Sequence, residues 1–222
     1  MGEWARVTTD DAHELNLYLA AGDDAASPGL VILQEIFGVT PALTSLADEF
    51  AGHGFRVVVP ALYDRIEPGY ILDYADTDTA RATKNQLRFD EIDADISAAM
   101  AFAASDKPVA LLGYCWGGGL AYWMAQRHAV GAVVSYYGTG VANYCRSRVP
   151  EADCQFHLGV DDPMIDAEAR EVIRASCKSA DEYFEYEGAG HAFANAARPS
   201  YRDAQAQLAE QRTLAFLRDR LA

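Results

Sequence analysis

The sequence predicts an α/β protein with a mostly parallel central sheet covered by helices on both faces. Short apolar runs alternate along the 222-residue chain with stretches of helical periodicity, and this alternation is typical of strand–helix–strand units. The run at residues 30–33 is continuously apolar, as expected for a parallel strand buried on both faces. We expect residues 1–222 to form a single domain, because a chain of this length can bury one sizeable core.

The formal net charge of −15 restricts the classes of partner. So acidic a surface repels the phosphates of nucleic acids and of anionic membranes, and neither is expected as a partner. No apolar run approaches the ~18 residues of a spanning helix, and the first residues lack the apolar core of a signal peptide. The four cysteines show no zinc-type spacing. We expect a cytoplasmic protein without metal or cofactor, as a monomer or small homo-oligomer.

In the first half of the chain, leucine at every second position over residues 15–19 predicts an edge strand that is exposed on one face. Turns are expected at 22–24 and 27–29, before the strand at 30–33. Thr40 and Pro41 suit the N-cap and first position of a helix that runs to about Gly52. A second buried strand is predicted at 54–60, and one or two helices between 78 and 104.

In the second half, strands and helices continue to alternate. Strands are predicted at 109–113, 130–138, 154–159 and 182–186. One helix is predicted to begin just after Cys115, and others at 166–179 and 200–221. Residues 188–193 form a glycine-rich loop. Strands linked in this way form right-handed crossovers, so their carboxyl ends meet at one edge of the sheet, where ligands of α/β proteins bind.

Between the strand at 109–113 and the following helix lies Gly113-Tyr114-Cys115-Trp116-Gly117. This G-x-C-x-G pattern is that of a nucleophile elbow with cysteine in place of the commoner serine. The two glycines leave room for the helix to pack closely against the strand. The positive end of the helix dipole points at the sulfur and favours the thiolate.

A cysteine nucleophile needs a base, and the hydrolase chain order places an acid and then a histidine after it. His128 lies 13 residues down the elbow helix, roughly 20 Å from the sulfur. His157 falls within a strand and is expected to be a core histidine. His191, in the loop after the last strand, is the predicted base. The acid is Asp161 or Asp162, of which we prefer Asp162; alternatively, both only cap the next helix.

Six motifs resemble, in the same order, those of the dienelactone hydrolase family. They are Gln34-Glu35-Ile36-Phe37-Gly38-Val39, Pro60-Ala61-Leu62-Tyr63, Gly113-Tyr114-Cys115-Trp116-Gly117-Gly118, Tyr136-Tyr137-Gly138, Gly159-Val160-Asp161-Asp162 and Gly190-His191-Ala192-Phe193. The resemblance covers nearly the whole chain. It implies an α/β-hydrolase fold and a catalytic triad of Cys115, Asp162 and His191. It also implies that Glu35 reaches the thiol and that the backbone N–H groups of Ile36 and Trp116 form an oxyanion hole.

The roles of these residues also follow from their chemistry. His191 accepts the thiol proton, and Asp162 holds the imidazole tautomer and stabilises its charge. A carboxylate opposes thiolate formation, so Glu35 is interpreted as a gate that restrains the thiol until substrate displaces it. A thiolate leaves a tetrahedral intermediate more readily than an alkoxide. The substrate therefore needs a good leaving group, such as the enolate released from an activated lactone.

The substrate-binding residues match the family less well. Family members bind the substrate carboxylate through arginines, one of which closely follows the catalytic histidine, where this chain has Asn195. Arg198 lies three residues later, and a second arginine is expected before residue 90, with Arg81 the first candidate and Arg65 the next. Two aromatic residues of the shared motifs, Phe37 and Tyr137, complete the expected set.

The sequence therefore predicts a cofactor-free ester hydrolase similar to carboxymethylenebutenolidase. It would open an activated lactone or enol ester, dienelactone-like, through a thioester on Cys115. One alternative keeps the triad but takes aryl esters or thioesters, which the missing arginine favours. An alternative of another class is an inactive binding or redox-sensing protein that uses Cys115.

Overall fold

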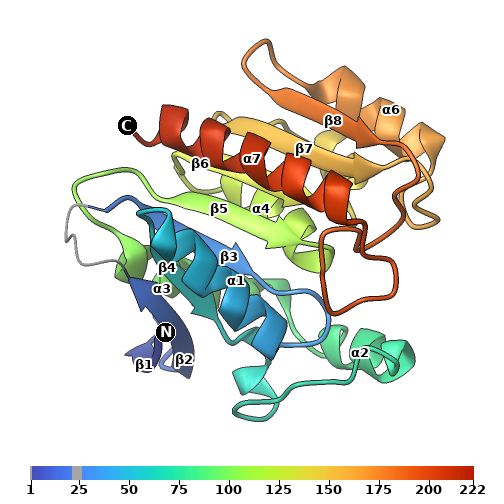
Figure 1. Cartoon of the computed structure of the whole chain (residues 1–222). Helices are drawn as coiled ribbons and strands as arrows, with labels where there is room; N and C mark the ends of the chain where they lie inside the picture. Colours follow the sequence, from blue (N-terminus) through green and yellow to red (C-terminus); the bar gives the residue numbers. More distant parts are fainter. Residues whose placement is uncertain (1, 22–26) are drawn as a thin grey trace. The chain divides into compact units, whose positions relative to one another are not determined.

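The computed structural model describes residues 2–21 and 27–222, and the turn expected at 22–24 lies outside this range. Two compact units are distinguished, Met1–Val109 and Ala110–Ala222. Figure 1 shows the elements of both. The N-terminal unit contains β1 (Glu3–Thr8), β2 (Glu14–Ala21), β3 (Gly29–Leu33), α1 (Pro41–Gly52), β4 (Arg56–Pro60), the 3-10 helix η1 (Leu62–Arg65), α2 (Thr77–Lys84) and α3 (Phe89–Ala103).

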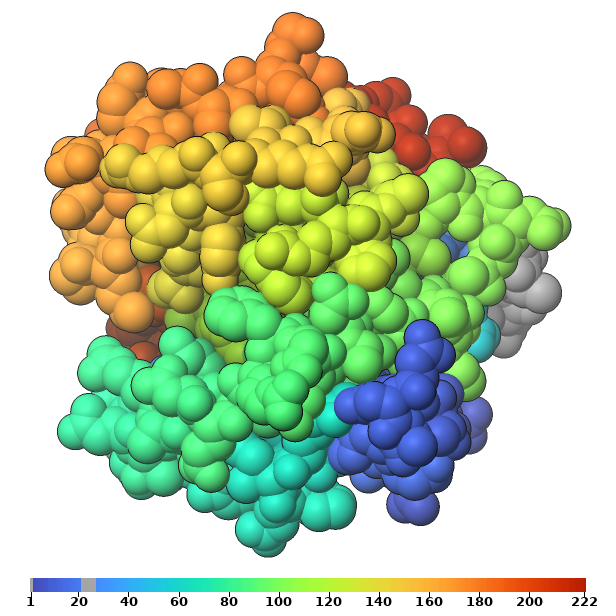
Figure 2. All heavy atoms as spheres, turned by 180° about the vertical axis from the view of Figure 1, so that it is seen from behind, coloured from blue at the N-terminus to red at the C-terminus, as the bar shows by residue number. Residues whose placement is uncertain are grey.

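The four strands of the N-terminal unit lie in the order β1-β2-β4-β3. β1 and β2 are antiparallel, as are β2 and β4, whereas β3 and β4 are parallel. The prediction that residues 15–19 form an edge strand was wrong, because β1 pairs with the outer side of β2. β1 is mostly exposed, and Figure 2 shows this hairpin in blue at the surface of its unit. The six residues of β1 mix apolar and polar side chains, and no strand was predicted there from the sequence.

The helices of the N-terminal unit begin where their sequences predict. Thr40 is extended and its side chain accepts a hydrogen bond from the Leu43 amide, with Pro41 as the first helical residue. The segment 78–104 forms two helices, and the longer one, α3, packs on β3 and β4. Buried Phe50 anchors α1, which contacts β2 and β4.

The C-terminal unit contains four parallel strands in the order β5-β6-β7-β8. They are β5 (Ala110–Tyr114), β6 (Ala132–Tyr136), β7 (Asp153–Gly159) and β8 (Glu182–Tyr186), joined by α4 (Trp116–Ala125), α5 (Val141–Cys145) and α6 (Ala167–Ser176) and followed by α7 (Asp203–Arg220). The strands and helices predicted here are confirmed, except that α6 ends earlier than expected. The five-residue helix α5 was not predicted, because it is too short to show a helical period.

Helices cover both faces of this parallel sheet. Ser135 and Tyr136 are consecutive in β6, so their side chains point to opposite faces. The Ser135 hydroxyl donates to the Gly118 carbonyl of α4 at 3.1 Å, whereas the Tyr136 hydroxyl bonds Thr213 of α7 at 2.7 Å. α4 and α7 therefore lie on opposite faces, and Figure 1 shows α7, in red, crossing in front of β6 and β7. No helix of the described residues has the length and apolar character needed to cross a membrane.

Candidate active site

Cys115 occupies a strained turn between β5 and α4. Its backbone has φ of 54° and ψ of −118°, a conformation that side chains other than glycine rarely adopt. The turn is possible because Gly113 has no side chain: a Cβ atom there would lie 2.0 Å from the Gly117 carbonyl oxygen. This is the geometry of a nucleophile elbow, and it places residue 115 at the start of a helix.

Backbone hydrogen bonds hold Cys115 in this conformation. Its N–H donates to the Tyr136 carbonyl at 3.0 Å, and its carbonyl accepts from the amides of Gly118 at 3.1 Å and Thr139 at 3.0 Å. Strained backbone persists only where its surroundings over-determine it. These bonds and a further one from the Gly119 amide, at 3.3 Å, tie Cys115 to α4, β6 and the turn after β6 and supply that constraint. The side chain is 6% exposed.

His191 and Asp162 form a close pair after β7 and β8. His191 Nδ1 lies 2.8 Å from Asp162 Oδ2, and the other oxygen of Asp162 accepts from the Met164 amide at 2.8 Å. The Asp162 side chain is fully buried, whereas Asp161 is exposed to solvent. The helix after these aspartates is capped by Asp166, whose side chain accepts from the Ala169 amide. The geometry therefore pairs Asp162, and not its neighbour, with the histidine.

The pKa of His191 reflects both of its predicted partners. Burial lowers it, but the hydrogen bonds and charges of Asp162 and Cys115 outweigh burial and raise it to about 10. Nε2, the ring atom opposite the Asp162 contact, is buried and meets no hydrogen-bond acceptor in ideal geometry among the described residues. Because Cys115 contributes to the raised pKa, its thiol lies near the ring, and catalytic hydrogen bonds are often loose in hydrolases without substrate. Tyr137 lies edge-on to the imidazole, 5.1 Å between centroids.

His157 is fully buried in β7, as the sequence predicts for a core histidine. Its ring nitrogens contact the Tyr186 hydroxyl and the Gln155 side chain, each at 2.8 Å. Burial lowers its pKa to about 3, with a further lowering by the charge of Arg212. His157 is therefore neutral at physiological pH and lies apart from the Asp162–His191 pair.

The N-terminal unit contains the predicted thiol gate, Glu35, and one of the two predicted oxyanion-hole residues, Ile36. Glu35 and Ile36 follow β3, and Glu35 is 7% exposed. The Tyr63 hydroxyl donates to the Ile36 carbonyl at 2.8 Å, and Phe37 packs edge-on against Tyr74 at 4.8 Å. This loop is therefore firmly held within its own unit. In the C-terminal unit, Trp116 is the first residue of α4, so its N–H precedes the first intrahelical bond. Both roles remain predictions.

A sequence model of the Dienelactone hydrolase family matches residues 15–221. The chain belongs to the dienelactone hydrolase family. A carboxymethylenebutenolidase of Pseudomonas sp. strain P51 is 35% identical over 200 residues, which cover 86% of this chain and 84% of that protein. A carboxymethylenebutenolidase of Pseudomonas putida is 31% identical over 97% of this chain and 95% of its own. Family membership makes this chain an ester hydrolase of the dienelactone hydrolase type.

Solved structures agree with the fold. A candidate dienelactone hydrolase from Klebsiella pneumoniae superposes with a TM-score of 0.86 at 22% identity, covering 98% of both chains. A thermophilic esterase from Thermogutta terrifontis superposes with a TM-score of 0.68 at 17% identity, covering 100% of this chain and 96% of its own. These similarities confirm the α/β-hydrolase fold.

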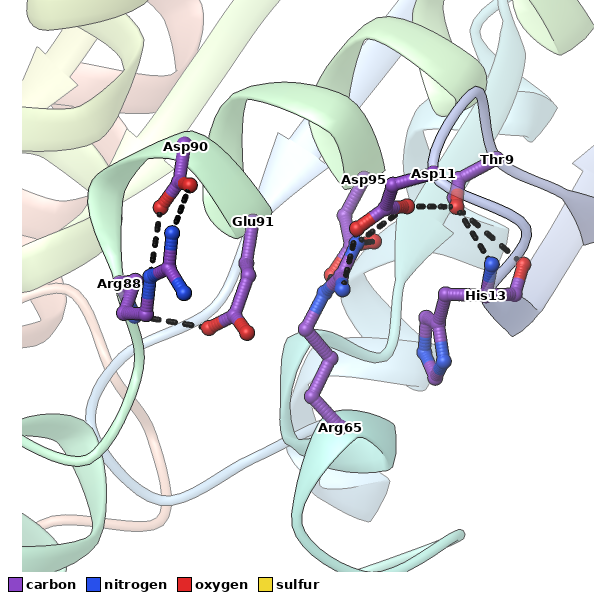
Figure 3. Close-up of polar contacts among 8 residues, drawn as sticks. All are labelled: Thr9, Asp11, His13, Arg65, Arg88, Asp90, Glu91 and Asp95. Carbon is purple, nitrogen blue, oxygen red and sulfur yellow. Dashed lines mark hydrogen bonds and ion pairs between the residues drawn. The ribbon is translucent and has the colours of Figure 1, made fainter.

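The three arginines proposed to bind substrate differ in their surroundings. Arg65 donates two hydrogen bonds to Asp95, at 2.7 and 3.0 Å, and two to Asp11, and Figure 3 shows it between them. The Arg65 guanidinium is thus already bound by two aspartates of the protein itself. Arg81 is 56% exposed and lies 3.6 Å from Asp78. Arg198 is half-buried in the loop after His191, where its amide donates to the Asn195 carbonyl.

Two residues that support Cys115 were not predicted from the sequence. Tyr136 and Thr139 hold the backbone of Cys115, but nothing local in the sequence assigns them this role. Their contribution depends on the register between β5 and β6, which follows from long-range pairing.

Among the described residues, no group of three or more His, Cys, Asp or Glu side chains is arranged to hold a metal ion.

Proposed function

We propose that this protein opens an activated lactone or enol ester, dienelactone-like, through a thioester formed on Cys115. The observation that carries the proposal is His191, which contacts the buried carboxylate of Asp162 and lies against a cysteine on a strained elbow. The side chains of Asp162 and His191 are both largely buried, although each lies in a loop. We propose Cys115, His191 and Asp162 as the catalytic triad.

The raised pKa of His191 defines its role in the first step. With a pKa of about 10 the imidazole carries its proton at neutral pH and places a positive charge beside the Cys115 sulfur. The thiolate attacks the ester carbonyl and the tetrahedral oxyanion forms. We propose that the amides of Ile36 and Trp116 stabilise that oxyanion. His191 then donates its proton to the departing oxygen and becomes neutral.

In the second step water hydrolyses the thioester. His191, now neutral, removes a proton from the attacking water, and Asp162 stabilises the imidazolium that forms. Collapse of the second tetrahedral intermediate expels the sulfur of Cys115, releases the carboxylic acid and restores the thiolate–imidazolium pair. An enolate suits the first step because it leaves at least as readily as a thiolate, whereas an alkoxide does not.

The proposed gate is tested separately from the triad. If Glu35 restrains the thiol, Glu35→Ala should change the pH–rate profile of Cys115 alkylation, while Glu35→Gln should reproduce the change without altering the size of the side chain. Identical profiles in all three proteins would exclude the gate. Alkylation is to be followed on the peptide that contains Cys115, because three other cysteines are also free.

A second candidate substrate class, aryl esters or thioesters, is favoured by the arginines. Arg65 is committed to two carboxylates, and Arg81 is largely exposed. If neither binds a substrate carboxylate, neutral activated esters are preferred. If one does, Arg81→Ala should raise KM for the carboxylate-bearing lactone and leave KM for a neutral aryl acetate unchanged.

The decisive experiment compares dienelactone, an aryl acetate and an acyl thioester as substrates of wild type, Cys115→Ala and Cys115→Ser. Preferential turnover of dienelactone that is lost in Cys115→Ala supports the proposal. Turnover of all three esters in Cys115→Ala would refute the thioester. If no ester is turned over while Cys115 reacts with peroxide, the protein is a redox sensor.

We also propose that residues 1–222 form one hydrolase domain that acts in the cytoplasm on a small-molecule substrate. One family model spanning 15–221 supports the single domain, and four unpaired cysteines support a reducing compartment. Light scattering would establish whether the protein is a monomer or a small homo-oligomer.

A further inference from the structure

Four ring side chains stack across four neighbouring strands of the C-terminal unit. Tyr114, Tyr136, His157 and Phe184 occupy directly paired positions on β5, β6, β7 and β8. Their successive centroids are 4.7, 4.4 and 5.6 Å apart, and adjacent planes differ by 27°, 26° and 24°. Strands lie about 4.8 Å apart, so rings at paired positions on one face reach stacking distance. We refer to these four residues as the ring ladder.

Arg212 and Thr213 of helix α7 contact three members of the ring ladder, since the Thr213 hydroxyl also lies 3.0 Å from Nε2 of His157. The Tyr136 hydroxyl lies 2.7 Å from the Thr213 hydroxyl, and the Arg212 guanidinium lies over the Phe184 ring at 4.0 Å. The same guanidinium donates to the Tyr186 hydroxyl at 3.1 Å. The ladder therefore lies between the sheet and α7, the helix that crosses β6 and β7 in Figure 1.

The polar atoms of His157 have one consistent arrangement. The Gln155 amide nitrogen donates to Glu182 and to the Arg212 carbonyl, so its oxygen is the acceptor that faces His157. Nε2 of His157 must then carry the proton, and Nδ1 accepts from the Tyr186 hydroxyl at 2.8 Å. Both ring nitrogens are thereby satisfied with the ring neutral. A second proton, on Nδ1, would force the Tyr186 hydroxyl to turn and accept it, beside the positive charge of Arg212.

The backbones of the two central rings hold the candidate catalytic residues. The Tyr136 carbonyl accepts the Cys115 N–H at 3.0 Å, and the His157 carbonyl accepts the Tyr137 N–H at 2.7 Å. Tyr137 has φ of 38° and lies edge-on to His191. The chain passes directly from Tyr114 to Cys115. Movement of the two central rings would therefore displace both the nucleophile and the surface against which His191 packs.

We propose that Tyr136 and His157 are positioning residues, which hold the nucleophile and the base at catalytic separation through the ring ladder. This inference rests on the proposed function, since it assigns the ladder to the Cys115–His191 pair. Backbone strain at residues 115 and 137 makes the arrangement dependent on rigid neighbours. A misplacement of about 1 Å lowers catalytic rates by up to roughly 10²-fold.

The test compares removal of a ring with removal of a hydroxyl. Tyr136→Leu removes the stacked ring, and Tyr136→Phe keeps it. Phe156→Leu is the matched control, because Phe156 is a buried ring next in sequence to His157 that points to the opposite face, toward Tyr122. Readouts are kcat and KM for an aryl acetate, the pH dependence of Cys115 alkylation by iodoacetamide, and the melting temperature.

We expect Tyr136→Leu to lower kcat about tenfold to a hundredfold with little change in KM, and to alter the alkylation profile. Tyr136→Phe should recover most of the lost kcat. Phe156→Leu should lower the melting temperature comparably while leaving kcat and the alkylation profile intact. Equal losses of kcat in Tyr136→Leu and Phe156→Leu would overturn the proposal, because the ring would then serve stability alone.

Two further results separate the ladder from the proposed function. If wild type hydrolyses no ester, the proposed function fails, but the alkylation profiles still report whether the ladder positions Cys115. If Tyr136→Leu does not fold, Phe184→Leu at the half-buried end of the ladder replaces it. We expect a smaller loss of kcat there, about threefold, and an unchanged kcat would contradict the proposal.

Discussion

Replacement of Asp162 by asparagine tests the acid of the proposed triad most directly. The substitution keeps the shape of the side chain but removes the charge that lies 2.8 Å from His191 Nδ1. The carboxylate is fully buried, so solvent does not screen its effect on the imidazole. The pKa of His191, about 10 in the native protein, should fall toward its ordinary value of 6.5. His191 is then no longer fully protonated at pH 7.

The expected loss is large. Charge removal from the acid of a related triad lowers kcat by about 10⁴, and a cysteine nucleophile is less dependent on its base, so we expect about 10²- to 10⁴-fold here. This corresponds to roughly 3–5 kcal/mol of transition-state stabilisation. The assays are kcat/KM for an aryl acetate and an NMR titration of His191.

Asp161→Asn is the matched control, because it removes the same charge from the exposed neighbour. We expect kcat/KM within about twofold of wild type. Because folding raises the pKa of His191, the protonated ring adds to the free energy of unfolding; this contribution is complete below pH 6.5 and is lost as the pH rises toward 10. Asp162→Asn should therefore reduce the dependence of the free energy of unfolding on pH over that range. Equal activity of the two variants, or a greater loss in Asp161→Asn, would refute the assignment of Asp162.

Three other predictions concern stability. Gly113→Ala should prevent folding of the elbow, because its Cβ would lie 2.0 Å from a carbonyl oxygen. At Gly52 a Cβ atom would have nothing within 4 Å, so Gly52→Ala should raise the free energy of unfolding by about 0.5–1 kcal/mol. Urea titration measures both. Arg65→Met should cost about 3–5 kcal/mol by leaving a buried carboxylate unpaired, while Arg88→Met, in the exposed pair of Figure 3, should leave the melting temperature unchanged. The depressed pKa of His157 means that the unfolded chain binds a proton first as pH falls. The contribution of neutral His157 to the free energy of unfolding is therefore present above pH 6.5 and is lost as the pH falls toward 3, with about 2 kcal/mol lost at pH 5. His157→Gln should lack this pH-dependent component when unfolding is measured across that range.

Local patterns predicted most elements of the fold because they depend on neighbouring residues. The helix that begins at Thr40 was predicted from its cap and proline, and the strand at 30–33 from uninterrupted apolar residues. β1 was missed because its residues are mostly exposed and its stability comes from pairing with β2. The edge assignment of 15–19 failed for the same reason: which strand lies outermost is not a local property.

The candidate site was predictable as far as chain order and loop position reach. Cys115, Asp162 and His191 were selected in this way, and the structure brings Asp162 and His191 into contact and His191 against Cys115. Asp162 was preferred over Asp161 from its position and from the family resemblance, and the physical difference between them, burial of Asp162 and exposure of Asp161, is visible only in the structure. The ring ladder could not be predicted, because Tyr136 and His157 become neighbours only when strand register is known.

The elbow grips residue 115 solely by its main chain. Its N–H donates to one carbonyl, its carbonyl accepts from three amides, and none of these contacts touches the sulfur. The atom that performs the attack can therefore be exchanged while its trajectory is preserved. Serine or selenocysteine installed at this position would meet the same imidazole from the same direction, so differences in rate among the three proteins would measure intrinsic nucleophilicity. The scaffold is in this sense a ready-made comparator for oxygen, sulfur and selenium chemistry.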